Sequence, residues 1–202
     1  RRQRMQRWKK WAAGAVGAAG VAALGTWLYR REKAAVASDY AVERGADGFE
    51  LRRYPAMLLA ETVQAGAREP AMTRGFGLLA DYIFAESREG PALALALPLI
   101  VTEAGDGRWR VRLPMPRGTR RENLPEPEGE VAIVALPERR VAALRFAGRD
   151  NDTLLVEKTA ALRAWLDEQA LASAGAPEFA FYSPPLVPGP LRHNEVWVAV
   201  GP

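Results

Sequence analysis

The chain has 202 residues, enough for one domain or for one domain with a tail. Apolar residues make up 49% and charged residues 26%, a globular balance that excludes wholesale disorder. The sequence has no cysteine and a single histidine, which excludes disulfide scaffolds, thiolate metal sites and multi-histidine metal sites.

Positive charge is concentrated at the start of the chain. Residues 1–33 contain nine Lys or Arg and one acidic residue, a net charge of +8. The rest of the chain has 19 basic and 23 acidic residues, a net charge of −4. Nucleic-acid binding is therefore disfavoured, because an acidic body lacks the basic surface that neutralises phosphates.

Residues 11–29 carry no charge and would span about 28 Å as an α-helix, at about 1.5 Å per residue. Aromatic residues stand at both ends, and the flanking basic residues are denser on the N-terminal side. This pattern predicts a single transmembrane helix in the lipid bilayer of a bacterial inner membrane. The N-terminus would be cytoplasmic, and the domain, residues 34–202, would lie in the periplasm. The alternative is a signal peptide cleaved near Ala35-Val36-Ala37.

Small residues recur at four-residue spacing in this segment, at Gly14, Ala18 and Ala22. Such a row lets two helices approach closely, which favours packing against other transmembrane helices. The alternative is an Ala-rich span without a helix partner.

The body contains an internal repeat with an offset of 82 residues between residues 49–66 and 131–148. Pro55 falls on Pro137, and Gly66 falls on Gly148. Each copy is typical of a strand, a turn at the proline, a second strand and a glycine that leads into a helix. The alternative is a chance likeness between two hairpins, which the shared offset across turn, glycine and helix disfavours.

Apolar spacing predicts the helices at 70–85 and 152–170, the second with Asn151 or Asp152 as its N-cap. Two β segments follow each helix, at 92–103 and 108–114 and again at 178–182 and 195–200. Gly105-Asp106-Gly107 predicts a hairpin turn. The repeats, about 49–114 and 131–200, are thus each β-β-α-β-β, which predicts an α+β domain in which helices cover an antiparallel sheet. A ligand cleft between the halves is expected.

No sequence motif indicates a catalytic site or a metal site. The G-x-G-x-x-A match at residues 75–80 falls inside a predicted helix, without the preceding parallel strand that dinucleotide binding requires. His193 has no identifiable serine and carboxylate partners and is interpreted as an exposed loop or strand-start residue. We therefore expect a protein that is not an enzyme.

Six segments resemble the SOUL heme-binding protein family. They are residues 49–55 (FELRRYP), 75–84 (GFGLLADYIF), 111–116 (VRLPMP), 141–148 (VAALRFAG), 178–185 (EFAFYSPP) and 191–198 (LRHNEVWV). The resemblance covers nearly all of residues 40–200. It implies a duplicated, distorted antiparallel β-barrel with two helices, similar to the ligand-binding domain of multidrug-sensing transcription regulators.

Two departures from the family bear on heme. Leu95 and Ala96 stand where members often have methionine and threonine. Arg53 stands where some members carry an iron-ligating histidine, and an arginine cannot ligate iron as an imidazole does. Other members hold heme without such a ligand, in a shallow apolar groove with basic residues near the propionates.

Together with the predicted transmembrane helix, the resemblance leads us to expect a membrane-anchored domain that binds heme or a related tetrapyrrole or hydrophobic ligand without catalysis. We expect the ligand against the first helix, with residues 183–194 as the opposite wall; the predicted binding residues are Met72, Arg74, Phe76, Leu79 and Ile83. Arg74 would meet a carboxylate. The alternative for the apolar residues is ordinary core facing the sheet. The alternative function is an accessory subunit of a membrane protein complex, in which the domain is a scaffold without heme.

Overall fold

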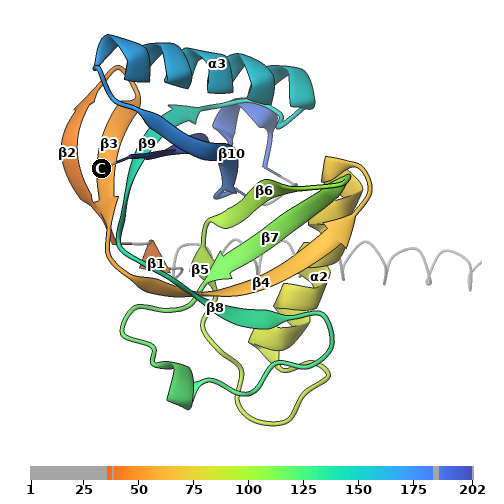
Figure 1. The fold of residues 1–202 in the computed structure, drawn as a ribbon. Coiled ribbons are helices and arrows are strands. Elements are labelled where there is room, and N and C mark those ends of the chain that lie inside the picture. Colours follow the sequence, from red (N-terminus) through yellow and green to blue (C-terminus); the bar gives the residue numbers. More distant parts are fainter. Residues whose placement is uncertain (1–35, 38, 184–186, 202) are drawn as a thin grey trace, which may run out of the picture.

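A computed structural model describes residues 36–37, 39–183 and 187–201. Nine strands form one sheet in the order β2-β3-β9-β11-β10-β6-β7-β4-β8 (Figure 1). Every pairing in this sheet is antiparallel. Its strands are β2 (Ala41–Ala46), β3 (Phe49–Tyr54), β4 (Met57–Ala65), β6 (Leu99–Gly105), β7 (Arg108–Pro114), β8 (Ala132–Leu136), β9 (Arg139–Phe146), β10 (Ser173–Phe181) and β11 (Asn194–Val200).

The described residues also form two α-helices, α2 (Arg68–Phe84) and α3 (Asp152–Glu168). The predicted start of the second helix is confirmed, because the Asn151 side chain accepts a hydrogen bond from the Leu154 amide. Two short 3₁₀ turns, η1 (Arg121–Asn123) and η2 (Gly189–Leu191), lie in connecting segments. A separate parallel pair joins β1 (Val36–Ala37) to β5 (Ala96–Leu97).

The described elements follow the order strand, strand, helix, strand, strand twice, in β3-β4-α2-β6-β7 and again in β8-β9-α3-β10-β11, with the short β5 before β6. The strand order from β3 to β8 is symmetric about its centre, because reading it from either end gives a first, a second, a fourth and a third strand of a repeat. A pseudo-twofold axis therefore passes between β10 and β6, which pair directly. The two helices are related in the same way.

Pro55 and Pro137 each lie between two strands, as predicted. These strands do not pair with each other, because β3 pairs with β9 and β8 pairs with β4. The first strand of each repeat thus pairs with the second strand of the other repeat. Nor is the sheet a closed barrel: β2 pairs only with β3 and β8 only with β4 in the described chain, so both remain edges of an open sheet. Residues 92–95, predicted as strand, precede the short β5.

The membrane predictions are corrected as well. No helix in residues 36–37, 39–183 and 187–201 has both the length and the apolar character that crossing a bilayer requires. The predicted transmembrane helix, its Gly14, Ala18 and Ala22 row and the domain boundary at residue 34 lie outside the described residues. The localisation as a single-pass inner-membrane protein with a periplasmic domain is therefore without support.

Alternate residues along each strand point to opposite faces, and both helices pack on the same face. The main core lies there, with Leu79 and Ile83 of α2 and Leu155 and Leu162 of α3 in one cluster. We call this the helix-covered face. The opposite face carries a smaller apolar cluster that includes Tyr54, Ile100 and Trp197, and most of the buried charge.

Gly75, from the rejected dinucleotide motif, lies in α2 where the helix approaches β7. A Cβ atom there would lie 2.7 Å from Val111 Cγ2. We expect Gly75→Ala to destabilise the domain by about 1–3 kcal/mol through overpacking, measured by chemical denaturation. Gly77→Ala, two residues along the same helix with no atom within 4 Å of its Cβ, should be neutral or stabilising by up to about 1 kcal/mol. Equal effects would contradict this packing role.

Candidate functional site

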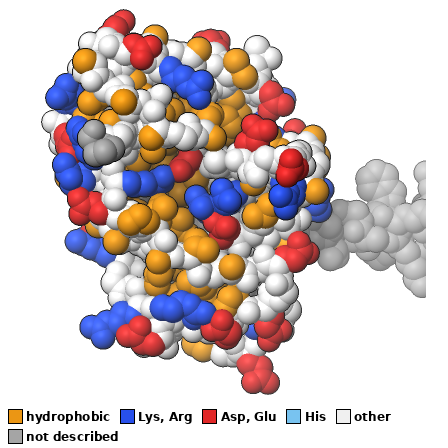
Figure 2. All heavy atoms as spheres, viewed as in Figure 1, with side chains coloured by type: hydrophobic (Ala, Val, Ile, Leu, Met, Phe, Trp, Pro, Cys, Tyr) orange, Lys and Arg blue, Asp and Glu red, His pale blue; other side chains and the backbone are white. Residues whose placement is uncertain are grey.

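A groove of about 670 Å³ runs along α3 on the helix-covered face. It is lined by residues of α3 (Asp152, Leu155, Val156, Thr159, Ala160, Arg163, Ala164 and Asp167), by Pro177 and Phe179 of β10, by Glu103 and Trp109 at the β6–β7 hairpin, and by Arg68 of α2. Figure 2 shows hydrophobic side chains exposed beneath α3, with charged side chains around them. The volume lies within the about 300–1,000 Å³ that small-molecule sites occupy.

The groove exists because the two helices cover different parts of one face. Whereas α2 lies over β4 and β7, α3 lies over β9, β10 and β11. The apolar surface between them is left partly open. Val156 is 69% exposed, unusual for a large apolar side chain. Trp109 and Phe179 supply aromatic surface. Such a surface suits an apolar, aromatic ligand.

The charges of the groove are unevenly placed. Arg68 Nε donates to Asp152 Oδ1 at 2.7 Å, where both helices begin. Glu103, Arg163 and Asp167 form no ion pair with any described residue. Asp167 lies in the last turn of α3. The Arg68–Asp152 pair is therefore neutral at the start of α3, and the other charged residues of the lining, Glu103, Arg163 and Asp167, sum to a charge of −1.

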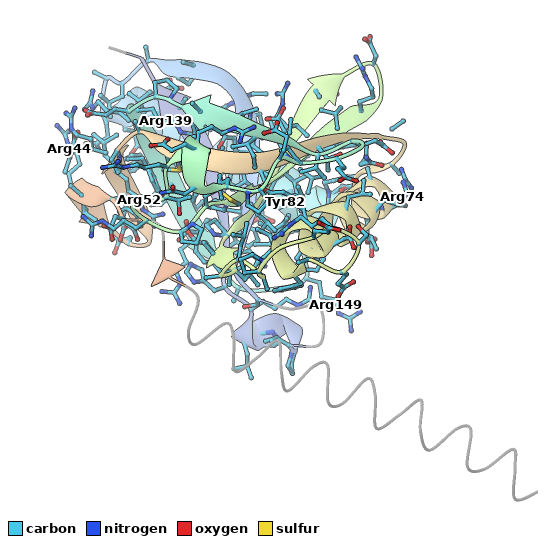
Figure 3. All side chains as sticks on the ribbon, turned by 90° about the horizontal axis from the view of Figure 1, so that it is seen from below. Arg44, Arg52, Arg74, Tyr82, Arg139 and Arg149 are labelled. Carbon is cyan, nitrogen blue, oxygen red and sulfur yellow. The ribbon has the colours of Figure 1, made fainter. Side chains whose placement is uncertain are left out.

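None of the five residues predicted to bind the ligand lines this groove. Leu79 and Ile83 are completely buried in the main core, and Met72 and Phe76 pack against it while half-buried. Arg74 is exposed on the outer side of α2 and donates to the Ala65 carbonyl (Figure 3). The structure thus gathers the four apolar residues on the face of α2 that meets the sheet, and separates Arg74 from them. Their role in ligand binding stays a prediction.

The opposite face holds a buried charged cluster centred on Glu195, which sequence reasoning missed. Arg52 donates to both Glu195 carboxylate oxygens, at 2.7 and 3.0 Å. Trp197 Nε1 donates to Oε2 at 2.6 Å, and the Tyr182 hydroxyl donates to the same oxygen at 3.2 Å. His193 Nε2 lies 2.8 Å from Oε1. Arg52 and Glu195 are 3% and 1% exposed.

Strand register explains this cluster. Arg52 on β3 and Glu195 on β11 both flank β9, and Ala143 is the β9 residue that lies between them on this face. The small alanine leaves room for the long arginine side chain. His193, predicted to be exposed, is half-buried and stacks on the Tyr182 ring at 4.1 Å. The only available signal was charge within otherwise apolar strands, at Arg52 in FELRRY and at Glu195 in NEVWVAV.

The cluster holds Glu195 ionised. Burial alone would raise the pKa of Glu195, but hydrogen bonds from His193 and Arg52 outweigh it and lower that pKa to about 2. Burial raises the pKa of the Tyr54 and Tyr182 hydroxyls far above the ordinary value, so both stay neutral. All acceptor positions of Glu195 are engaged by protein donors. The cluster therefore holds β3, β9 and β11 together rather than binding a ligand.

Comparison with protein-family models decides the family. The model of the SOUL heme-binding protein matches residues 37–199, nearly the whole described chain. The chain belongs to the SOUL family. No curated protein matches it by sequence.

Solved structures share the fold of this SOUL domain. The C-terminal domain of EcmrR matches with a TM-score of 0.61 at 10% identity, over 80% of this chain and 98% of that one. A hydrolase of Listeria innocua, encoded by lin2189, matches with a TM-score of 0.57 at 14% identity, over 80% and 94%. A second structure described as a hydrolase from Listeria innocua matches with a TM-score of 0.56 at 12% identity, over 79% and 94%. At these identities the likeness concerns the fold alone.

Two of the segments that resemble the SOUL family meet in the Glu195 cluster. Arg52 comes from residues 49–55 and Glu195 from residues 191–198, at opposite ends of the domain. Arg53, beside Arg52, points instead to an exposed ion-pair network with Glu43 and Glu138. The position at which some family members carry a histidine is thus occupied by a surface ion pair.

The residues of the groove fit only part of a heme. Its apolar walls and aromatic rings suit a flat macrocycle, and arginines are available for carboxylates. The lining contains no histidine, cysteine, methionine or tyrosine, the residues that serve as axial iron ligands. The single histidine is committed to Glu195, and the described residues contain no cluster of three or more candidate metal-binding side chains. The groove therefore suits the macrocycle without coordinating its iron.

Proposed function

We propose that this SOUL domain binds an apolar ligand of the tetrapyrrole class in the groove along α3, and that it does so without converting the ligand. The observation that carries the proposal is the open apolar groove of about 670 Å³ in a domain of a heme-binding family. Its walls are aliphatic and aromatic, and exposed apolar surface of this kind marks a binding site.

The ligand lies against α3, between Val156 and Ala160 on one side and Trp109 and Phe179 on the other. Alanines at positions 160 and 164 keep the helix side of the groove shallow and wide. A flat ring system gains most from such a surface, because it buries two faces at once.

We expect the full chain to bind one equivalent of protoporphyrin IX with saturable quenching of tryptophan fluorescence. Ala160→Trp should weaken this binding at least about tenfold, because the indole would occupy the groove. Position 160 is exposed, so the larger side chain can be accommodated without disturbing the core.

The matched control is Glu157→Trp, on the same helix but outside the groove lining. It should leave the affinity unchanged. Absence of saturable binding in the wild-type chain would contradict the proposal and favour a scaffold role without a ligand. Equal affinities of the wild type and Ala160→Trp would place the ligand elsewhere.

Iron should add little to the affinity. Because the groove lining lacks an axial ligand, we expect hemin and protoporphyrin IX to bind with dissociation constants within about tenfold of each other. The Soret band of bound hemin should lack the signature of strong axial coordination. A hemin affinity several orders of magnitude above that of the free base would show that the chain does supply an iron ligand.

A further inference from the structure

The two edges of the sheet differ in how they are protected against pairing with other chains. At one edge, β2 carries Glu43, Arg44 and Gly45, and its register beside β3 is irregular. Charges and bulges of this kind keep an edge strand from accepting a further strand. At the other edge, β8 (AIVAL) has no charged residue, proline or glycine, and it pairs only with β4 in the described chain (Figure 1). The edge at β8 is therefore the unprotected one.

The backbone of β8 presents hydrogen-bonding groups on its outer side. In β4, the Leu58 carbonyl accepts a hydrogen bond from the Met115 amide, which follows β7. Successive residues of an antiparallel strand bond to alternate neighbours, so the even-numbered residues of β4 bond towards β7 and the odd-numbered ones towards β8. Leu58 lies opposite Ala135 of β8. The N–H and C=O groups of Ala135, and by the same alternation those of Ile133, therefore point away from β4.

The internal repeat shows what this edge can accommodate. The strand order places β3 and β8 at equivalent positions, because each is the first strand of a repeat and lies beside the second strand of the other. On its outer side β3 has the antiparallel β2, in a register that runs from Ala41–Arg53 to Ala46–Phe49. No described strand has the corresponding place beside β8. One added antiparallel strand would complete the symmetry of the sheet.

The charge around β8 indicates which kind of strand fits there. Residues 122–138 contain five glutamates and no basic residue. Three of these glutamates, Glu128, Glu130 and Glu138, lie just before or just after β8, and all three are exposed. Glu138 shares an exposed ion pair with Arg53, whereas Glu128 forms no ion pair with any described residue. Both ends of the free edge are therefore acidic.

The same charges disfavour pairing between two copies of β8. If Ile133 of one copy exchanged hydrogen bonds with Ala135 of the other, the antiparallel register would place Glu130 opposite Glu138 at both ends. Like charges directly opposite each other destabilise a strand pair. A strand with Lys or Arg at its ends would instead be attracted to these glutamates.

We propose that the free edge of β8 binds an extended segment of a partner protein, an apolar strand flanked by Lys or Arg residues, as an added antiparallel strand. The backbone of this segment exchanges hydrogen bonds with Ile133 and Ala135, and its basic ends pair with the flanking glutamates. In strand addition of this kind the main-chain hydrogen bonds supply affinity. No residue of β8 lines the groove along α3, so this inference does not rest on the proposed function.

The test uses a synthetic peptide, acetyl-KKVTVTVKK-amide, labelled with a fluorophore and titrated with the full chain while its anisotropy is recorded. We expect saturable binding that Ala135→Pro weakens at least about tenfold. Proline removes an N–H group that points outward, and edge strands tolerate proline at such positions. The matched control is Ala135→Val, which keeps the N–H group and should bind the peptide as the wild type does.

The flanking charges are tested with a pair of charge reversals. Glu128→Lys should weaken binding of the basic peptide by about two- to fivefold, the range of an exposed ion pair. Asp47→Lys, in the β2–β3 turn at the opposite edge, should leave the affinity unchanged. Equal losses in the two variants would reduce the effect to net charge and overturn the assignment of a basic partner.

Two further peptides keep the inference testable if Ala135→Pro does not fold. They are methylated at alternate backbone nitrogens, in two complementary sets, and titrated with the wild-type chain. One set should abolish binding and the other should retain it, because only alternate amides of an added strand face β8. Equal affinities of the two sets, or no saturable binding of the unmethylated peptide, would overturn the proposal. A wild-type dimer that Ala135→Pro dissociates in sedimentation would assign the edge to a second copy and would also overturn it.

Discussion

Glu195→Ala is expected to destabilise the domain by about 3–5 kcal/mol, the largest effect of any single substitution that we foresee. Arg52 would remain 97% buried with Glu50 as its one carboxylate partner, at 2.6 Å from Nε. Trp197 Nε1 would also lose its acceptor, at the centre of the opposite face. A buried cation without its counter-charge costs far more than the original pair contributes.

The same carboxylate makes stability depend on pH. The folded-state pKa of Glu195, about 2, lies below the ordinary value of 4.5, so the unfolded chain binds a proton first as pH falls. The contribution of Glu195 is thus complete above about pH 5 and is lost progressively between about pH 4.5 and pH 2.

Urea denaturation of the full chain between pH 7 and pH 3 checks both expectations. The wild type should lose stability towards acid with a slope that Glu195→Gln lacks in this window. Glu157→Ala, which removes an exposed ion pair with Lys158, should change the unfolding free energy by less than about 1 kcal/mol. If Glu195→Ala changed the unfolding free energy as little as this control, the cluster would not be a major contributor to stability.

Leu79→Ala should destabilise the domain by about 2–5 kcal/mol. Leu79 is fully buried where α2 meets the sheet, and truncation would leave a cavity that the surrounding strands cannot close. Leu162 on α3 is equally buried and should give a similar loss. Denaturation midpoints of the two variants provide the measurement.

Ligand affinity separates this core role from a binding role. If Leu79 acts only in the core, folded Leu79→Ala should bind protoporphyrin IX as the wild type does. Ala160→Trp should show the reverse pattern, with normal stability and weak binding. A Leu79→Ala variant that folds but no longer binds protoporphyrin IX would place the ligand against α2, as the sequence analysis predicts.

The repeat and most of the elements could be predicted because each depends on local signals. Asn151 marks a helix start, and Gly105-Asp106-Gly107 marks a hairpin, in which all three residues have positive φ. The exchange of first strands could not be predicted, since a proline turn between two strands looks the same whether or not those strands pair. That exchange decides the sheet order and leaves β2 and β8 as edges.

The groove along α3 could not be predicted from the sequence for a related reason. Both helices have an apolar face, and periodicity does not reveal which of them is left partly uncovered. Val156 and Ala160 each follow a buried residue in the sequence, yet both are exposed and line the groove. The Glu195 cluster likewise required long-range register, because Arg52 and Glu195 are 143 positions apart.

The central claim is that the ligand lies along α3. The most direct test is amide chemical-shift mapping of the ¹⁵N-labelled full chain titrated with protoporphyrin IX, which is diamagnetic. We predict saturable shifts of the amide signals of residues 155–164 in α3. In β10 we predict them for the residues on either side of Pro177 and for Phe179, with little change in α2. Shifts centred on α2 near Met72 and Phe76, or no saturable shifts at all, would contradict the account.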